Sequence, residues 1–86
     1  MKIGYKKRFQ KEFKKLSPKI KNQFYTRLDI FKNNRFDQIL NNHSVDKEYS
    51  GCRSINLTGD YRAIFEDFGE IIIFLHIGTH SELYKK

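Results

Sequence analysis

The carboxyl-terminal part of the sequence combines an apolar segment with side chains that transfer protons. His76 lies inside the apolar run from Ile71 to Ile77, and His80 and Tyr84 follow it, four residues apart. A histidine gives or takes a proton near neutral pH, and at a reacting centre such a group contributes roughly 10²–10⁴-fold in rate. The spacing favours acid–base chemistry just beyond the end of a strand.

Cleavage of RNA without a metal requires groups of this kind. A base takes the proton of the 2′-hydroxyl, an acid protonates the leaving 5′-oxygen, and cations or hydrogen-bond donors stabilise the charged phosphorane. The candidates are His43 and His80 for proton transfer, Asp60 as base or orienting group, Arg53 and Arg62 for phosphate charge, and Tyr84 for stacking or hydrogen-bond donation.

Each candidate also has a purely structural interpretation. His76 shares a strand face with Ile72 and Phe74, so a packed role is favoured over a role in a site. His43 lies in a polar segment and could be an ordinary surface residue. Asp60 suits the turn T-G-D-Y in which it occurs.

The remaining candidates are open to the same alternative. The two arginines alternate with core positions and could pair with Glu66 or Glu48 across strands. Tyr84 could simply cover the edge of the core. Singly, none of these residues establishes a site.

No metal or cofactor site is expected. Gly78 interrupts any helix that would place His76 and His80 on one face, and no cluster of carboxylates or cysteines completes a ligand shell. The sequence contains no P-loop and no dinucleotide-binding glycine motif. We therefore expect catalysis without a cofactor or metal.

The first half of the chain predicts a short strand and two helices. Residues 1–5 suit a strand, and residues 6–16 place apolar residues on one side of a basic helix. Ser17 and Pro18 suit the start of a second helix, which runs to Asn33 or Asn34. The apolar positions of the two helices are Phe9, Phe13 and Leu16, then Ile20, Phe24, Leu28 and Phe31.

The second half predicts a connection followed by three strands. Residues 35–51 are mostly polar, with Phe36, Ile39 and Leu40 as apolar anchors. From residue 52 the period changes to two, and the short turns TGD and DFGE separate segments 52–57, 61–66 and 70–77. The order β-α-α-β-β-β predicts an α+β fold with a helical hairpin on one face of a small, mainly antiparallel sheet.

Length and composition predict one domain spanning residues 1–86. Eighty-six residues support one hydrophobic core, and the aromatic content of 15% makes that core feasible although only 38% of residues are apolar. No apolar run is long enough for a membrane span, and no signal-peptide segment is recognisable. With the single Cys52 these features suit a reducing, cytoplasmic location.

The positive charge is concentrated in the first half of the chain. Residues 1–34 hold eleven Lys and Arg against two acidic residues, a net charge of +9, whereas residues 35–86 hold six against eight, a net charge of −2. This asymmetry favours contact with a polyanion, most often nucleic acid. A solvated pair of lysine-rich helices is the alternative.

One long motif resembles a known family. YSGCRSINLTGDYRAIFE followed by IIIFLHIGTHSELY, between Asn42 and Tyr84, resembles the RelE/ParE superfamily of type II toxin–antitoxin toxins. Within it, the sequence is most similar to the YafQ-like and RelE/StbE-type mRNA interferases. The resemblance implies a monomeric toxin that cleaves mRNA, generally in the ribosomal A site, and that a cognate antitoxin inactivates by wrapping around it in a hetero-oligomer.

The resemblance also implies roles for individual residues. The YafQ-like pattern matches His43, Asp60, His80 and Tyr84, and the RelE-type pattern of strand arginines with a tyrosine matches Arg53, Arg62 and Tyr84. YafQ-like members can carry a further histidine where this chain has Asn56, which cannot shuttle protons at neutral pH. His80 then becomes the favoured proton carrier, with Asp60 or His43 as its partner.

The predicted phosphate-binding residues are Arg53, Asn56 and the basic run Lys6, Lys7 and Arg8. Two other functions stay open. ParE-like members of the superfamily inhibit DNA gyrase and do not cleave RNA. A non-catalytic relative would bind RNA through its basic half, or act only as a co-repressor with its antitoxin.

Overall fold

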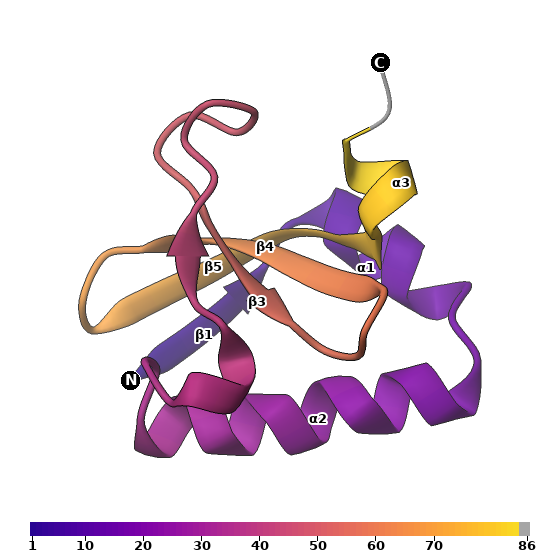
Figure 1. The fold of residues 1–86 in the computed structure, drawn as a ribbon, viewed down its shortest axis with the longest axis horizontal. Helices are drawn as coiled ribbons and strands as arrows, with labels where there is room; N and C mark the ends of the chain where they lie inside the picture. Colours follow the sequence, from indigo (N-terminus) through magenta and orange to yellow (C-terminus); the bar gives the residue numbers. More distant parts are fainter. Residues whose placement is uncertain (85–86) are drawn as a thin grey trace.

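The computed structural model describes residues 1–84, which are built around a five-stranded sheet (Figure 1). The strand order is β1-β5-β4-β3-β2, with β1 parallel to β5 and the other neighbouring pairs antiparallel. The strands are β1 Lys2–Tyr5, β2 His43–Ser44, β3 Arg53–Asn56, β4 Tyr61–Asp67 and β5 Ile71–Thr79. The helices are α1 Lys7–Lys14, α2 Pro18–Asn33, the 3-10 turn η1 Gln38–Leu40 and α3 His80–Leu83. The predicted α+β fold is confirmed, with β2, η1 and α3 as additional elements.

The helical hairpin of α1 and α2 covers one face of the sheet, as predicted. Ser17 starts α2, because its hydroxyl accepts a hydrogen bond from the Ile20 amide at 3.3 Å, and Pro18 occupies the first turn. The apolar stripes of both helices enter one core with the strands. Its largest fully buried side chains are Phe24, Phe31, Phe65 and Phe74.

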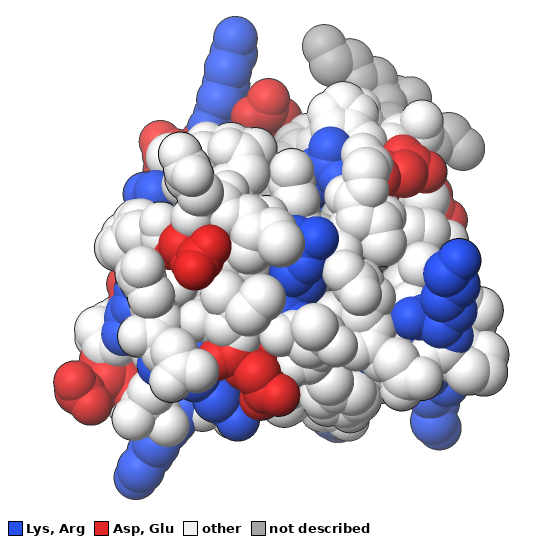
Figure 2. All heavy atoms as spheres, turned by 60° about the horizontal axis from the view of Figure 1, so that its bottom comes forward, with Lys and Arg blue, Asp and Glu red and all other residues white. Residues whose placement is uncertain are grey.

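The basic residues of the first half do not form one patch over α2. When the lower side of Figure 1, where α2 lies, is turned forward, basic and acidic side chains are separated by uncharged surface (Figure 2). The shorter helix α1 is more strongly basic, with Glu12 as its single acidic residue. No helix among residues 1–84 is long and apolar enough to cross a membrane.

A β-bulge in β5 changes which side chains face the helices. Ile64 of β4 pairs with His76 and Phe65 pairs with Phe74, so Leu75 has no partner in the ladder. Phe74 and Ile77 belong to the core beneath the helices, whereas Leu75 packs on the opposite face. The prediction that His76 shares a face with Phe74 is therefore wrong, because the extra residue reverses the alternation.

The strand continues through Gly78 instead of breaking there. Gly78 pairs with Arg62, and α3 begins two residues later. Thr79 caps α3 reciprocally with Glu82: the Thr79 hydroxyl accepts from the Glu82 amide at 3.2 Å, and the Glu82 carboxylate accepts from the Thr79 amide at 2.8 Å. A Cβ at residue 78 would lie 3.1 Å from the Glu82 carboxylate, so glycine permits α3 to fold close to the strand.

A second, smaller core covers the face of the sheet that the helical hairpin leaves open. It consists of the buried residues Val45, Cys52, Ile64 and Leu83. The turn between Val45 and Cys52 supplies two of them, and α3 supplies Leu83. The hydroxyl of Tyr49 in that turn donates a hydrogen bond to the Leu83 carbonyl, and this bond joins the turn to α3.

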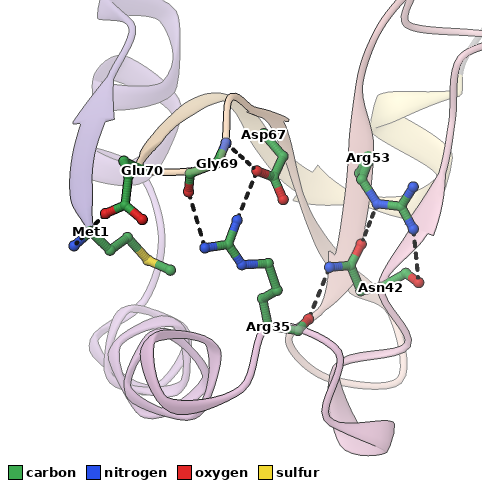
Figure 3. Close-up of polar contacts among 7 residues, drawn as sticks. All are labelled: Met1, Arg35, Asn42, Arg53, Asp67, Gly69 and Glu70. Carbon is green, nitrogen blue, oxygen red and sulfur yellow. Dashed lines mark hydrogen bonds and ion pairs between the residues drawn. The ribbon is translucent and has the colours of Figure 1, made fainter.

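A chain of polar contacts holds the long connection against the sheet (Figure 3). The Arg35 guanidinium donates to the Asp67 carboxylate at 2.8 Å and to the Gly69 carbonyl at 3.0 Å. The Asn42 amide donates to the Arg35 carbonyl, and its oxygen accepts from Arg53 Nε at 2.7 Å. The predicted connection over residues 35–51 is thus fixed immediately before His43.

Replacing Tyr49 by Phe tests the bond between the turn and α3. Tyr49→Phe keeps the ring packed on His76 and Tyr84 but removes the hydroxyl that binds the Leu83 carbonyl. We expect the free energy of unfolding to fall by about 1 kcal/mol and the α3 amides to exchange faster with solvent. Denaturant titration and hydrogen exchange measure both. Tyr25→Phe, at an exposed position of α2, is the control, and equal exchange in α3 of the two variants would contradict the role of Tyr49.

Replacing Asp67 by Asn tests the network around Arg35. Burial alone would raise the pKa of Asp67, but hydrogen bonds from the Gly69 amide and the Arg35 guanidinium lower it below its usual 3.8. The unfolded chain therefore binds the proton more readily, so this contribution to stability is complete above the unfolded pKa and is lost as pH falls through the folded pKa.

We expect Asp67→Asn to lower the free energy of unfolding by roughly 1.5–3 kcal/mol at pH 7. The difference from the natural chain should narrow as the pH falls below about 4. Urea titrations over a pH series measure this difference. Glu70→Gln changes a side chain that is 95% exposed and serves as control. A difference that stays constant from pH 7 to pH 3 would refute the assigned role of Asp67.

Candidate active site

A cavity of about 330 Å³ lies on the face of the sheet that the helical hairpin leaves open, and it brings together four of the five predicted catalytic residues. They are His43, Arg62, His80 and Tyr84, and the remaining lining residues are Ser44, Val45 and Glu48. They come from β2 and the turn that follows it, from β4, and from α3 and its end. Its volume is within the usual range of small-molecule sites, roughly 300–1,000 Å³.

His43 is held in a defined orientation by its own connection. Its Nδ1 lies 2.7 Å from the Asn41 carbonyl oxygen, an acceptor, so Nδ1 carries a proton and Nε2 of the neutral ring has a free lone pair. Asn41 has φ 47°, a left-handed conformation that asparagine tolerates well. In the ladder His43 lies opposite Ser54. The imidazole is therefore suited to accept a proton at Nε2.

Arg62 supplies a positive charge at the cavity. Its Nη1 donates to the carbonyl oxygens of Thr58, Gly59 and Tyr61, each at 3.2 Å. These carbonyls belong to the β3–β4 turn or adjoin it, so the turn fixes one end of the guanidinium. Its other nitrogens make no hydrogen bond to the residues that the structure describes, which leaves donors for an anion.

Asp60 contributes its backbone to the site. The Thr58 hydroxyl accepts from the amides of Asp60 and Tyr61, which shapes the turn as the sequence predicted. The Asp60 carbonyl accepts from the His80 amide at 2.9 Å and so positions the start of α3. The Asp60 side chain does not line the cavity, so its role as a base stays a prediction.

His80 and Tyr84 lie one helical turn apart with ring centroids 4.7 Å from each other. Burial raises the pKa of the Tyr84 hydroxyl, the Ser54 hydroxyl and the Arg62 charge oppose this shift, and the Glu48 charge adds to it. The tyrosine therefore stays protonated at neutral pH. It offers a flat ring for stacking and a hydroxyl donor.

Two of the predicted phosphate-binding residues, Arg53 and Asn56, do not line the cavity. Arg53 donates to the Asn42 side chain and lies over the Phe36 ring, 5.6 Å from its centroid, outside the cavity. Neither Glu48 nor Glu66 forms an ion pair with it among residues 1–84. Asn56 lies opposite Arg62, and its buried Oδ1 has no hydrogen-bond partner in the described part of the chain. Their phosphate roles stay predictions.

The basic run at the start of α1 does not line the cavity either. Lys6 and Lys7 are exposed, and Arg8 lies 3.7 Å from Glu12, one turn further along. His76 is also outside the cavity: its Nδ1 lies 3.5 Å from the Glu12 carboxylate, and its ring packs on Tyr49. These contacts agree with the packed role expected for His76.

Glu48 is a charged lining residue that the sequence did not identify as a site residue; Ser44 and Val45 were not identified either. Its polar neighbours in the sequence are typical of a surface loop, and the sequence suggests for it only an ion pair with a strand arginine. The turn that carries it reaches the cavity because Val45 and Cys52 are buried against the sheet. No local pattern shows that arrangement. Within residues 1–84, no group of three or more His, Cys, Asp or Glu is placed to hold a metal ion.

Solved structures show the same fold in known toxins. YafQ from E. coli superposes with a TM-score of 0.81 at 20% identity, over 95% of this chain and 96% of that one. A chain of the E. coli DinJ–YafQ toxin–antitoxin complex gives a TM-score of 0.78 at 20% identity, over 95% of this chain and 94% of that one. A chain of the RelB–RelE antitoxin–toxin complex from Methanococcus jannaschii gives 0.73 at 22% identity, over 94% of each chain.

No curated protein sequence matches the chain. A family model does: the one described as the bacterial toxin of a type II toxin–antitoxin system, YafQ, matches residues 1–85. The match extends from the basic half, which the motif did not cover, through the segments that line the cavity. The chain therefore belongs to the YafQ family of type II toxin–antitoxin toxins.

Proposed function

We propose that this toxin is a metal-independent endoribonuclease that cleaves mRNA on the ribosome and is neutralised by a cognate antitoxin. The observation that carries the proposal is the meeting of His43, Arg62, His80 and Tyr84 around one cavity. These residue types supply a base, an acid, a cation and a stacking surface, which phosphodiester cleavage in RNA requires.

The geometry favours His43 as the base. Its Nε2 takes the proton of a 2′-hydroxyl, whose oxygen then attacks the adjacent phosphorus. His80, in its protonated form, gives a proton to the 5′-oxygen as the P–O5′ bond breaks, leaving a 2′,3′-cyclic phosphate and a free 5′-hydroxyl. Arg62 stabilises the charge on the phosphorane, and Tyr84 stacks on a neighbouring base. Asp60 has less support as the base, since its side chain lies outside the cavity.

The family and the solved complexes support a protein partner. The E. coli DinJ–YafQ and Methanococcus jannaschii RelB–RelE structures are complexes of a toxin with an antitoxin. We propose that this chain likewise binds a cognate antitoxin and that the complex masks the cavity. The A site of a translating ribosome is the proposed place of action, because two histidines and an arginine are few groups for this reaction and the ribosome would position the mRNA.

Replacing His80 by Ala should remove activity without unfolding the protein. We expect cleavage to fall by roughly 10²–10⁴-fold and growth inhibition to disappear, because the acid is lost. Primer extension on mRNA from translating ribosomes measures cleavage, and circular dichroism checks the fold. His76→Gln, a change at the histidine outside the cavity, is the matched control and should stay toxic. Cleavage by His80→Ala at the rate of the natural chain would exclude the assigned role.

Overexpression separates the proposed function from the gyrase-inhibiting and non-catalytic alternatives. We expect translation to stop and mRNA to be shortened, with cleavage unaffected by EDTA at concentrations that leave the ribosomes intact. Purified ribosomes with and without the toxin provide the comparison in vitro. Intact mRNA together with an SOS response would instead indicate a ParE-like activity, and non-toxic expression with RNA binding retained would indicate a non-catalytic protein.

A further inference from the structure

A carboxylate lines the cavity beside the groups that would bind phosphate. Glu48 faces the same space as Arg62, His43 and His80, and it forms no ion pair with any of residues 1–84. A negative charge repels an RNA phosphate, so this side chain lowers general affinity for the substrate of the proposed function. Its presence in the cavity calls for a role other than phosphate binding.

The backbone around Glu48 is anchored although its side chain is exposed. The amides of Glu48 and Tyr49 both donate to the Val45 carbonyl, at 3.0 and 2.8 Å. Val45 is buried in the second core, and Tyr49 is bonded to the Leu83 carbonyl. The carboxylate thus extends from a fixed turn and is available to a ligand.

The two opposite charges of the cavity, on Arg62 and Glu48, lie close to Tyr84, whose ring can stack on a base. The charge of Arg62 lowers the pKa of its hydroxyl and the charge of Glu48 raises it, so both groups lie close to this side chain. A nucleotide whose base stacks on Tyr84 or His80 would direct its phosphate toward Arg62 and present a base edge to Glu48.

The chemistry of a carboxylate selects among the four bases. An ionised carboxylate only accepts hydrogen bonds, and its two oxygens match two adjacent donors. The Watson–Crick edge of guanine has such a pair, N1–H and the N2 amino group. Adenine and cytosine present one amino group next to an acceptor, and uracil presents one N–H between two carbonyl oxygens.

We propose that Glu48 is a specificity-determining residue that binds the Watson–Crick edge of a guanine stacked on Tyr84 or His80. This inference rests on the proposed ribonuclease function and names the base that the cavity prefers. Guanine is favoured most and uracil least, because uracil brings two oxygens toward the carboxylate.

The test measures binding separately from cleavage. The probes are tetranucleotides with 2′-O-methyl riboses, which lack the attacking hydroxyl: all-uridine, or uridine with one guanine at each position in turn. We expect the natural chain to bind the best guanine probe about tenfold more tightly than the all-uridine probe. In Glu48→Gln that preference should disappear, while affinity for the all-uridine probe rises because a repulsive charge is gone. Glu70→Gln, which removes a carboxylate from the β4–β5 turn, should retain the preference.

The outcomes distinguish failure of this inference from failure of the proposed function. Equal binding of all probes by the natural chain, or an unchanged preference in Glu48→Gln, overturns the role of Glu48. Glu48→Gln could instead slow the cleavage of every RNA substrate equally while the guanine preference in binding stays intact. That result also overturns the role of Glu48 in specificity and makes Glu48 the general base of the reaction. If the natural chain prefers guanine, Glu48→Gln loses that preference, and the protein never cleaves mRNA on ribosomes, the role of Glu48 in recognising guanine is supported and the proposed ribonuclease function is rejected.

Discussion

The site depends on covering the second face of the sheet. A helical hairpin buries only one face, and the other carries Ile64, which needs burial as much as the residues beneath the helices. The turn from Val45 to Cys52 and α3 supply that cover, and the bond from Tyr49 to the Leu83 carbonyl joins them. Five of the seven residues around the cavity lie in or next to these covering segments: Ser44, Val45, Glu48, His80 and Tyr84. The packing that buries Ile64 therefore also assembles the site.

If the proposed ribonuclease function holds, attraction of RNA and selection of RNA belong to different parts of the molecule. The net charge of +9 in residues 1–34 provides long-range attraction for a polyanion, but none of those residues lines the cavity. The cavity itself holds both signs, with Arg62 and Glu48 on a surface that contains two histidines. Salt should strongly weaken the long-range attraction by residues 1–34 and should weaken the contacts inside the cavity much less, because screening acts mainly on exposed and distant charges.

The sequence predicts the elements that its periodicity encodes. Both helices and the strands β1, β3, β4 and β5 lie within about two residues of the predicted segments, because apolar spacing decides which face is buried. β2 was not predicted, since two residues carry no periodic signal and their partner lies in β3. Alternation alone does not show the bulge at Leu75, and for that reason it predicts the wrong face for His76.

The candidate site likewise contains residues that the sequence can identify and residues that only the structure shows. His43, His80 and Tyr84 could be selected because the motif singles them out together, although nothing in their spacing shows that one cavity joins them. Residue type alone suggests Arg53 as a phosphate ligand, and only the positions of Asn42 and Phe36 show that its guanidinium has structural partners. Glu48 could not be found from sequence, because its place depends on how the turn from Val45 to Cys52 lies on the sheet.

The bulge at Leu75 also constrains how this chain can change during evolution. Side chains of a regular strand alternate between faces, so losing Ile73 would put Ile72 and Phe74 on opposite faces, whereas losing Leu75 would only remove the bulge and leave Phe74 and Ile77 on one face. A one-residue deletion in β5 is therefore tolerable at the bulge but not in the regular ladder before it, whereas single substitutions keep the register. Relatives should differ in length within the connection before His43 far more often than within this strand.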